Sequence, residues 1–429
     1  YILLGVVEKE DKSLEPIDLP DPHWLIREFW RGISSPGRVS VNILSTEDVY
    51  VQQVDGKQIV VIQVPRADRT CRPVYIDGNP LSGTYRRSGE GDYRCTREEY
   101  LAMVRDASAQ TSDLQVMEEM GLDVLDPASI RSYRQRLSQA RPGHVWEALE
   151  DGEFLLRISA AAMGKDGRKH PTSAGLLMFG PEYQIVREFH HYFLDYREQD
   201  DPSGPWTYRL VSSSGDWSGN VYDFYFRVYE RLVRAIPPAA SGNTRPAATP
   251  AQRARREPLI ICLVNADYYG RRGVVILRRK DQISLSNPGS FRVEIEAAKS
   301  GGISDPRNSA LLKMFHLIDA GKRTGSGIPN IFSVWNQQGW KEPVIEEEFE
   351  PDRITLSLQL HGTEGADPSS AEHPPASSRL GRRRKTDAQK QAIAEYLTVH
   401  VSASCPELAR LLGVKDARAR LLLHEMVEA

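Results

Sequence analysis

The sequence predicts an α+β fold in which two mixed α/β modules are followed by a small all-α end. Short apolar runs with the period of β-strands alternate with amphipathic helical segments in residues 1–105 and again in residues 256–360. Residues 387–429 instead show three helical segments and no strand. Hydrophobic residues make up 40% of the chain and charged residues 26%, a balance that is typical of a folded, water-soluble protein.

Length, charge and cysteine spacing limit the classes of function. The 429 residues suffice for roughly two to four domains, and the net charge of −3 means that nucleic-acid contacts must come from a local basic patch. No apolar run approaches about 20 residues, so no membrane span is expected. The chain opens in the middle of an expected strand, so we expect its natural N-terminus to lie upstream. No zinc site is predicted, and reduced thiols in a cytoplasmic protein are expected, because the cysteines are far apart: Cys71, Cys95, Cys262 and Cys405.

Residues 1–108 are predicted to form a mixed α/β domain. A helix is expected over Pro22–Arg31, because Asp21 and Pro22 have the arrangement of an N-cap and a first-turn proline. A second helix is expected over Glu98–Asp106. The strands expected between and before them are Ile2–Val7, Val39–Ile43, Gln58–Val64, Pro73–Ile76 and Thr84–Arg87.

This first domain carries arginines with tyrosines between them. Such a set suits phosphate contacts and base stacking. A solvated strand face whose tyrosines lie in the core explains the same pattern, and both interpretations remain open here. The candidate nucleic-acid contacts are Arg66, Arg69, Arg72, Arg86 and Arg87, interleaved with Tyr75, Tyr85 and Tyr93.

Residues 109–180 are predicted to form a helical connector. Asp126 and Pro127 mark the start of one helix, and Gly180 ends the apolar helix Thr172–Phe179. Two further helices are expected around Val145–Leu149 and Phe154–Ala162.

Residues 181–360 are predicted to form the second α/β module. Val186–Tyr196 is expected to be a strand, so His190 and His191 would face opposite sides and could not share a metal ion. An amphipathic helix over Asn220–Ile236, a Pro- and Ala-rich loop over 237–252 and a strictly alternating strand over Ile354–Leu360 complete the prediction.

One stretch, Arg256–Ile328, organises this module. It contains in order a helix, a two-stranded ribbon, a turn, a second helix, and the glycine loop Gly325-Ser326-Gly327 before another helix. Backbone N–H groups at a helix N-terminus suit a phosphate. A tight turn that uses glycine for its positive φ explains the loop equally well.

The C-terminal residues are predicted to be a linker and a small domain. Residues 361–386 have too few apolar side chains to fold. Residues 387–429 have the three-helix layout of a helix-turn-helix or winged-helix domain, which trihelical protein-contact domains share. The candidate DNA contacts are Arg382, Arg383, Arg384 and Lys385 in the linker, and Lys415, Arg418 and Arg420 on the recognition helix.

Four short sequence motifs of the central stretch resemble those in the C-terminal module of a bacterial family with Schlafen-type, AlbA-like N-terminal domains. They are Asn265-Ala266-Asp267-Tyr268-Tyr269, Asn287-Pro288-Gly289, Asp305-Pro306-Arg307-Asn308 and Gly325-Ser326-Gly327. The module is similar to GHKL ATPases and is often described as a helicase C-terminal region. The motifs that resemble the family's AlbA-like N-terminal domain are Leu3-Leu4-Gly5-Val6, Ile62-Gln63-Val64-Pro65, Arg72-Pro73-Val74-Tyr75 and Tyr85-Arg86-Arg87-Ser88-Gly89.

The resemblance implies a truncated AlbA-like domain, a GHKL-ATPase-like α/β sandwich and a nucleotide site. The carboxylate motif proposed for Schlafen-type nucleases would precede Tyr1, so no catalytic residue can be named. In GHKL ATPases a helix carries Glu-x-x-x-Asn, which places the water-polarising group at Glu257 and the Mg²⁺ ligand at Ile261, a residue that cannot coordinate Mg²⁺. We therefore expect no appreciable ATP hydrolysis, and at best weak nucleotide binding through Glu257, Asn265, Asp267, Asn287, Gly289, Gly325, Ser326 and Gly327.

Three classes of function follow. The first is a cytoplasmic DNA-binding transcriptional regulator with a degenerate ATP-binding-like module, no metal site and no required cofactor, with DNA as the main partner. The second is an ATPase or a Schlafen-type RNA nuclease whose catalytic residues lie upstream, with RNA as partner and ATP and Mg²⁺ as cofactors. The third is an oligomerisation scaffold, for instance a homodimer. Bound nucleotide would separate the second from the third, and salt-dependent DNA binding would separate the first from both.

Overall fold

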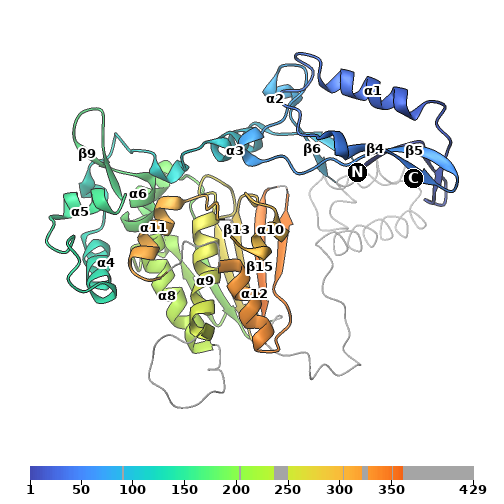
Figure 1. Ribbon diagram of the computed structural model, residues 1–429. Helices are drawn as coiled ribbons and strands as arrows, with labels where there is room; N and C mark the ends of the chain where they lie inside the picture. Colours follow the sequence, from blue (N-terminus) through green and yellow to red (C-terminus); the bar gives the residue numbers. More distant parts are fainter. Residues whose placement is uncertain are drawn as a thin grey trace, which may run out of the picture. The chain divides into compact units, whose positions relative to one another are not determined.

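The computed structural model describes residues 1–88, 91–201, 204–235, 250–302, 304–320, 327–349 and 351–360 (Figure 1). The chain divides into two compact units, residues 1–363 and residues 364–429. The predicted linker and three-helix domain lie outside the described residues, so those predictions stay predictions. The described part is a mixed α+β protein with twelve α-helices, one six-stranded mixed sheet and several small sheets.

The N-terminal residues form a small three-stranded sheet with one helix against it. The strand order is β1 (Ile2–Leu4), β5 (Lys57–Ile62) and β4 (Val49–Val54), and a separate ribbon pairs β2 (Val6–Glu8) with β3 (Leu14–Pro16). Helix α1 (Pro22–Ile33) starts as predicted, because the Asp21 carboxylate accepts a hydrogen bond from the Trp24 N–H at 2.8 Å. Val60 and Ile62 of β5 pack against Phe29 and Trp30 of α1. This packing fixes the register of the small sheet, because a one-residue shift of β5 would turn its buried residues outward.

The end of this segment differs from the prediction at two strands. The expected strands Val39–Ile43 and Pro73–Ile76 are wrong, because only isolated bridges form there, between Val39 and Ile76 and between Tyr75 and Thr84. The elements that do form are α2 (Pro80–Gly83), the ribbon β6 (Tyr85–Ser88) with β7 (Gly91–Arg94), and α3 (Arg97–Ala107). Thr96 and Glu99 cap α3 reciprocally, so its start is set by local sequence.

The connector is less helical than predicted. It contains α4 (Pro127–Ala140), α5 (Asp151–Arg157), the ribbon β8 (Ala161–Met163) with β9 (Lys169–Pro171) and α6 (Ser173–Phe179), and α7 (Glu182–Glu188) follows it. Residues 145–149 form turns, so the helix expected there is wrong. The strand expected over Val186–Tyr196 is also wrong in its first half, because α7 extends to Glu188 and the strand begins at Leu194. His190 and His191 consequently lie in the turn between the two elements.

The central sheet has the order β11-β10-β12-β13-β15-β14. Its strands are β11 (Tyr208–Val211), β10 (Leu194–Gln199), β12 (Val274–Arg279), β13 (Gln282–Pro288), β15 (Arg353–Gln359) and β14 (Val344–Glu348). β10 and β12 are parallel and every other neighbouring pair is antiparallel. The predicted two-stranded ribbon is therefore β12–β13, and it lies in the middle of a larger sheet.

Helices cover the apolar face of this sheet (Figure 1). They are α8 (Val221–Ala235), α9 (Pro250–Asn265), α10 (Ile295–Ser300), α11 (Ser309–Leu317) and α12 (Gly327–Gln337). Ile283 and Leu285 of β13 are buried beneath them, while Ser284 and Ser286 point to the other face. Pro258 lies in the interior of α9, because the helix begins at Pro250, although a proline is tolerated best in the first turn of a helix.

The connector and the central module share one hydrophobic core. Buried residues from Met117 to Leu360 belong to the same cluster. Tyr133 of α4 is fully buried, and its hydroxyl donates to the Met314 carbonyl of α11 at 2.8 Å. The connector therefore stabilises the helical layer that forms one wall of the candidate site.

Candidate functional site

A cavity of about 120 Å³ lies between α9, the end of β13 and the start of α12. Four of the predicted nucleotide-site residues line it: Glu257, Asn265, Asn287 and Gly327. Asp267 and Gly289 line a neighbouring cleft instead. Gly325 and Ser326 lie outside the described residues. The structure thus brings together half of the eight predicted residues.

The wall of the cavity at Ile261 is apolar. A Cβ placed on Gly327 would lie 3.1 Å from Ile261 Cδ1, so glycine is what allows α12 to begin so close to this side chain. Ile260, Val264 and Phe291 also line the cavity. An aliphatic group next to the glycine offers no oxygen to a hard cation at this point.

The predicted polar groups are bound to their own neighbours. The buried Glu257 carboxylate accepts a hydrogen bond from Asn330 Nδ2 of α12 at 2.7 Å. Asn265 Nδ2 donates to the Ile261 carbonyl at 2.8 Å, one turn earlier in the same helix. Asn287 Nδ2 donates to the Pro288 carbonyl at 3.1 Å. The contact of Glu257 with Asn330 connects α9 to α12, the contact of Asn265 lies within α9, and the contact of Asn287 lies at the end of β13.

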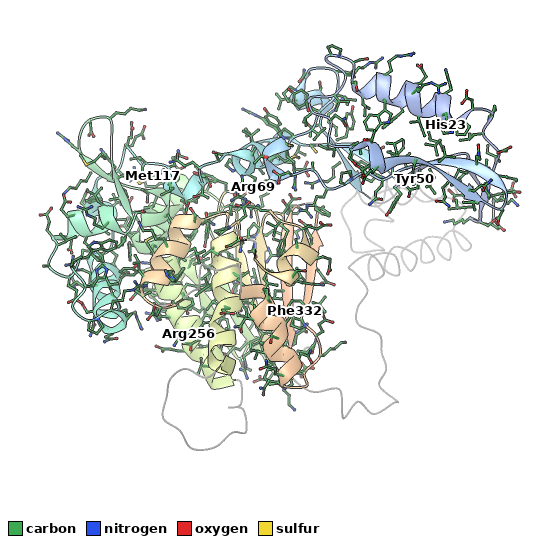
Figure 2. The ribbon with its side chains drawn as sticks, viewed as in Figure 1. His23, Tyr50, Arg69, Met117, Arg256 and Phe332 are labelled. Atoms are coloured by element: carbon green, nitrogen blue, oxygen red, sulfur yellow. The ribbon has the colours of Figure 1, made fainter. Side chains whose placement is uncertain are left out.

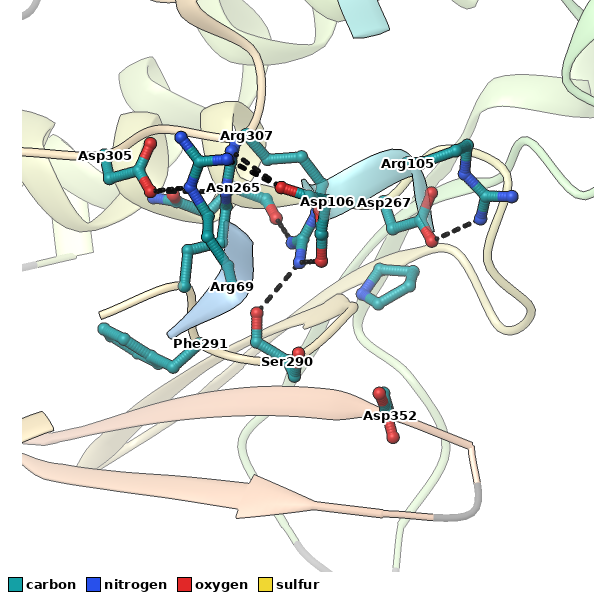
Figure 3. Close-up of polar contacts among 12 residues, drawn as sticks. Arg69, Arg105, Asp106, Asn265, Asp267, Ser290, Phe291, Asp305, Arg307 and Asp352 are labelled. Atoms are coloured by element: carbon teal, nitrogen blue, oxygen red, sulfur yellow. Dashed lines mark hydrogen bonds and ion pairs between the residues drawn. The ribbon is translucent and has the colours of Figure 1, made fainter. Parts of the chain in front are cut away.

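Arg307 is the polar centre of the adjoining region (Figure 3). Its Nε and one Nη donate to the two carboxylate oxygens of Asp106, at 2.8 and 2.7 Å. The guanidinium also donates to the Asn265 carbonyl and, at 2.9 Å, to the Ser290 carbonyl. Burial alone would raise the pKa of Asp106, but the charge and hydrogen bonds of Arg307 outweigh burial and hold that pKa below its ordinary value.

The structure gives most of the predicted N-terminal arginines intramolecular partners. Arg66 donates to both oxygens of Glu347, at 2.6 and 2.8 Å, and to the Phe291 carbonyl at 2.7 Å. Arg69 pairs with Asp305, and it lies where the N-terminal segment meets the central module (Figure 2). Phe291 and Asp305 also line the cavity, so two of these contacts connect the segment to the cavity wall, and the third connects it to β14.

The remaining arginines of that set differ from one another. Arg86 pairs with Glu99 at 3.0 Å and with Asp352 at 2.7 Å, whereas Arg87 is exposed and pairs with Asp92. Arg72 donates its Nε to the Ala67 carbonyl at 2.8 Å. The tyrosine interpretation is corrected at Tyr85 and Tyr93, which are 45% and 58% exposed and so do not lie in a core.

Sequence reasoning missed the acidic partners of these arginines. Asp106, Asp305, Glu347 and Asp352 receive the guanidinium groups, yet no local pattern marks them. The motif Asp305-Pro306-Arg307-Asn308 is one of those that carry the resemblance, and it is the only feature of the sequence that singles out Arg307. In the part of the chain that the structure describes, no group of three metal-ligating side chains is found. Within the same residues, no helix has the length and apolar character that a membrane crossing requires.

Comparison with known proteins supplies two family matches. Residues 272–356 match the family described as "Putative ATP-dependent DNA helicase recG C-terminal". Residues 101–195 match a family described as a domain of unknown function, DUF8451. The search of curated proteins gives no match.

Two solved structures are similar to this chain, one over nearly its whole length and the other over a part of it. The DIP2311 protein from Corynebacterium diphtheriae is 17% identical, with 99% of this chain and 78% of that chain covered and a TM-score of 0.45. The N-terminal domain of a RecG-related protein from Nitrosomonas europaea is 33% identical, with 22% of this chain and 62% of that chain covered and a TM-score of 0.17. Residues 272–356, from the start of β12 into β15, are therefore similar in sequence to the C-terminal region of RecG-type proteins.

Proposed function

We propose that this chain is a DNA-binding regulator whose central module has a GHKL-like layout without ATPase chemistry. The observation that carries the absence of ATPase chemistry is Ile261, which lines the cavity beside Gly327 at the position where the resemblance expects a Mg²⁺ ligand. Without that ligand the cavity serves as a binding or packing element.

The DNA-binding part of the proposal has two supports. The central module is similar to a family whose description names a DNA helicase. The C-terminal residues carry a basic run and the expected recognition helix. In the described part of the chain Arg66, Arg69 and Arg86 are already paired with carboxylates, and a paired guanidinium offers less to a phosphate. We therefore assign the main DNA contact to residues 382–420 rather than to the N-terminal arginines.

The proposed organisation follows the predicted boundaries. Residues 1–108 form an AlbA-like segment, 109–180 the connector, 181–360 the GHKL-like module, 361–386 a linker and 387–429 a winged-helix-like domain. The connector and the module share a core, so we expect them to act as one body.

The test is duplex-DNA binding by the full chain at two salt concentrations. Replacing both Arg418 and Arg420 by Ala should weaken binding and lower the salt dependence by about one for each phosphate that is no longer neutralised. Lys165→Ala is the matched control, because that side chain is 90% exposed and lies in the connector. Affinity of the double variant that equals the control at both salt concentrations would remove the C-terminal domain from the DNA-binding role.

A further inference from the structure

A second and larger cleft, of about 540 Å³, lies between α3 and the loops at the ends of the central strands. Its size is within the range of pockets that hold small organic ligands. Its walls include Arg72, Arg105 and Asp106 from the N-terminal side, and Asp267, Arg272 and Asp352 from the central module. Ser290 lines both this cleft and the cavity at Ile261, so the two spaces are neighbours with different walls.

Most charges that line the cleft are matched within the protein. Arg105 pairs with Asp267 at 3.0 Å, and Arg307 pairs with Asp106 at 2.7 Å. At the rim, Arg271 pairs with Glu98 at 2.6 Å. Within each of these three pairs the two charges neutralise each other, so the pairs offer little net charge to a ligand.

Two arginines of the wall are left over. Among the described residues, no carboxylate lies within 4.0 Å of Arg72 or of Arg272, although five other arginines on or beside the cleft have such a partner. Arg272 is exposed at the rim. Arg72 is partly buried, and its Nε donates to the Ala67 carbonyl at 2.8 Å. Burial, together with the nearby charge of Arg66, lowers its pKa, and the more distant carboxylates of Asp106, Glu347 and Asp68 oppose that change only in part. A guanidinium in that position is stabilised by an anion.

The opposite imbalance is found at Asp352. Asp352 and Glu99 share the single guanidinium of Arg86, so two carboxylates meet one cation. Burial raises the pKa of Asp352, and Arg86 only partly opposes that change. The Asp352 side chain is 21% exposed, and it lines the cleft. A ligand N–H group near it would be favourable for the same reason that an anion is favourable near Arg72.

We propose that this cleft binds a small phosphorylated compound that also carries an amino group, with the phosphate at Arg72 and the amino group toward Asp352. A nucleoside monophosphate with an exocyclic amine has this chemistry and a matching size. The phosphate of a DNA strand has the same charge, and the experiment therefore separates the two sources. The inference does not depend on DNA binding by residues 387–429 or on the cavity at Ile261.

The experiment is titration calorimetry on the full chain at low salt, with adenosine monophosphate, adenosine, ribose 5-phosphate and a short DNA duplex as probes. Adenosine monophosphate should bind, and both partial probes should bind more weakly. Arg72→Gln should weaken adenosine monophosphate binding by about ten-fold or more, the effect of removing one charge-assisted hydrogen bond. Asp352→Asn should reduce the preference over ribose 5-phosphate. Arg87→Gln, an exposed arginine of the same segment that does not line the cleft, should bind like the parent.

Three results would overturn the proposal. They are no binding of adenosine monophosphate by the parent chain, equal binding by Arg72→Gln, and binding of the duplex alone with a loss in Arg72→Gln, which would assign the phosphate to nucleic acid. If Arg72→Gln unfolds, Arg72→Lys keeps the charge without the planar fork, and it should retain binding that Asp352→Asn still alters.

Discussion

Arg307 and Asp106 form a two-pronged ion pair across 201 residues of sequence, with donor–acceptor distances of 2.8 and 2.7 Å. Both groups are largely buried, with side-chain exposures of 6% and 17%. The pair joins the end of α3 to the loop after β13 and to the end of α9, because Arg307 also donates to the Ser290 and Asn265 carbonyls (Figure 3).

Removing one partner of this pair should be costly. Asp106→Ala leaves a buried guanidinium without its counter-charge, and we expect a loss of about 3–5 kcal/mol in unfolding free energy. Glu98→Ala is the control, because its pair with Arg271 is exposed on both sides and should contribute less than about 1 kcal/mol. Chemical denaturation of both variants measures the difference. Similar losses of unfolding free energy in the two variants would show that the buried Arg307–Asp106 pair stabilises the fold no more than an exposed ion pair does.

Gly289 lies close to the Arg307 guanidinium, so it provides a second test of the packing around the Arg307–Asp106 pair. Its φ is +98°, and a Cβ there would lie 2.5 Å from an Arg307 Nη. Gly143 also has a positive φ, +75°, but a Cβ there would meet nothing within 4 Å. Gly143→Ala should therefore cost about 1–2 kcal/mol from backbone strain, and Gly289→Ala about 1–3 kcal/mol more from the clash. Melting of the two variants side by side isolates the clash, and equal melting temperatures would contradict the packing around Arg307.

The local starts of helices could be predicted from sequence, and the ion pairs could not. Asp21 before Pro22 and Asp126 before Pro127 cap their helices as expected, because a cap needs only the next three residues. Thr172, expected as the first residue of its helix, is the N-cap of α6. Arg66 finds Glu347 281 residues away, so nothing near Arg66 in the chain indicates that it is paired. Arg87 pairs with Asp92 only five residues away, whereas the partners of Arg66 and Arg69 lie in the central module.

Two errors in secondary structure have the same origin. Residues 186–196 suggest one strand, yet the first three of these residues belong to α7, in which Ile185 is buried against the core. Pro258 suggests a helix start, yet α9 continues through it, because Leu259, Ile260 and Leu263 bury apolar surface that outweighs one missing hydrogen bond. In both places tertiary packing decides the outcome.

His170 should make stability depend on pH. Its two ring nitrogens lie 2.9 Å from an Asp166 carboxylate oxygen and 2.8 Å from the Met120 carbonyl. These two acceptors, Asp166 first, raise the pKa of His170 above 6.5. Because the folded-state pKa is the higher one, this stabilisation is complete below pH 6.5 and is lost as the pH rises through the folded-state pKa.

Melting curves of the parent chain and of His170→Gln measure this effect. The gap in melting temperature between them should be largest below pH 6.5 and should narrow as the pH rises through the folded-state pKa of His170. A difference in melting temperature that does not change with pH would show that the folded chain does not stabilise the doubly protonated form of His170.

The last prediction concerns ATP. The Glu257 carboxylate is held by Asn330 at 2.7 Å, and Ile261 occupies the next turn of α9, facing Gly327. Mg²⁺ needs oxygen ligands in near-octahedral geometry, and an isoleucine side chain supplies none. Asn265 is one further turn away, two turns from Glu257 instead of the one turn that the Glu-x-x-x-Asn spacing requires, and its Nδ2 donates to the Ile261 carbonyl. Without the metal, the charge that develops on the transferred phosphate is not neutralised.

We therefore expect no Mg²⁺-dependent ATP hydrolysis above the buffer rate, and the same background rate in Glu257→Ala. Ile261→Asn restores an oxygen at the second position, and it should make ATP stabilise the chain against heat only when Mg²⁺ is present. Phosphate release from the purified chain, measured with and without Mg²⁺, is the direct assay. Turnover that requires Mg²⁺ and disappears in Glu257→Ala would show that the apolar Ile261 position is compatible with catalysis, and the regulator proposal would give way to an ATPase.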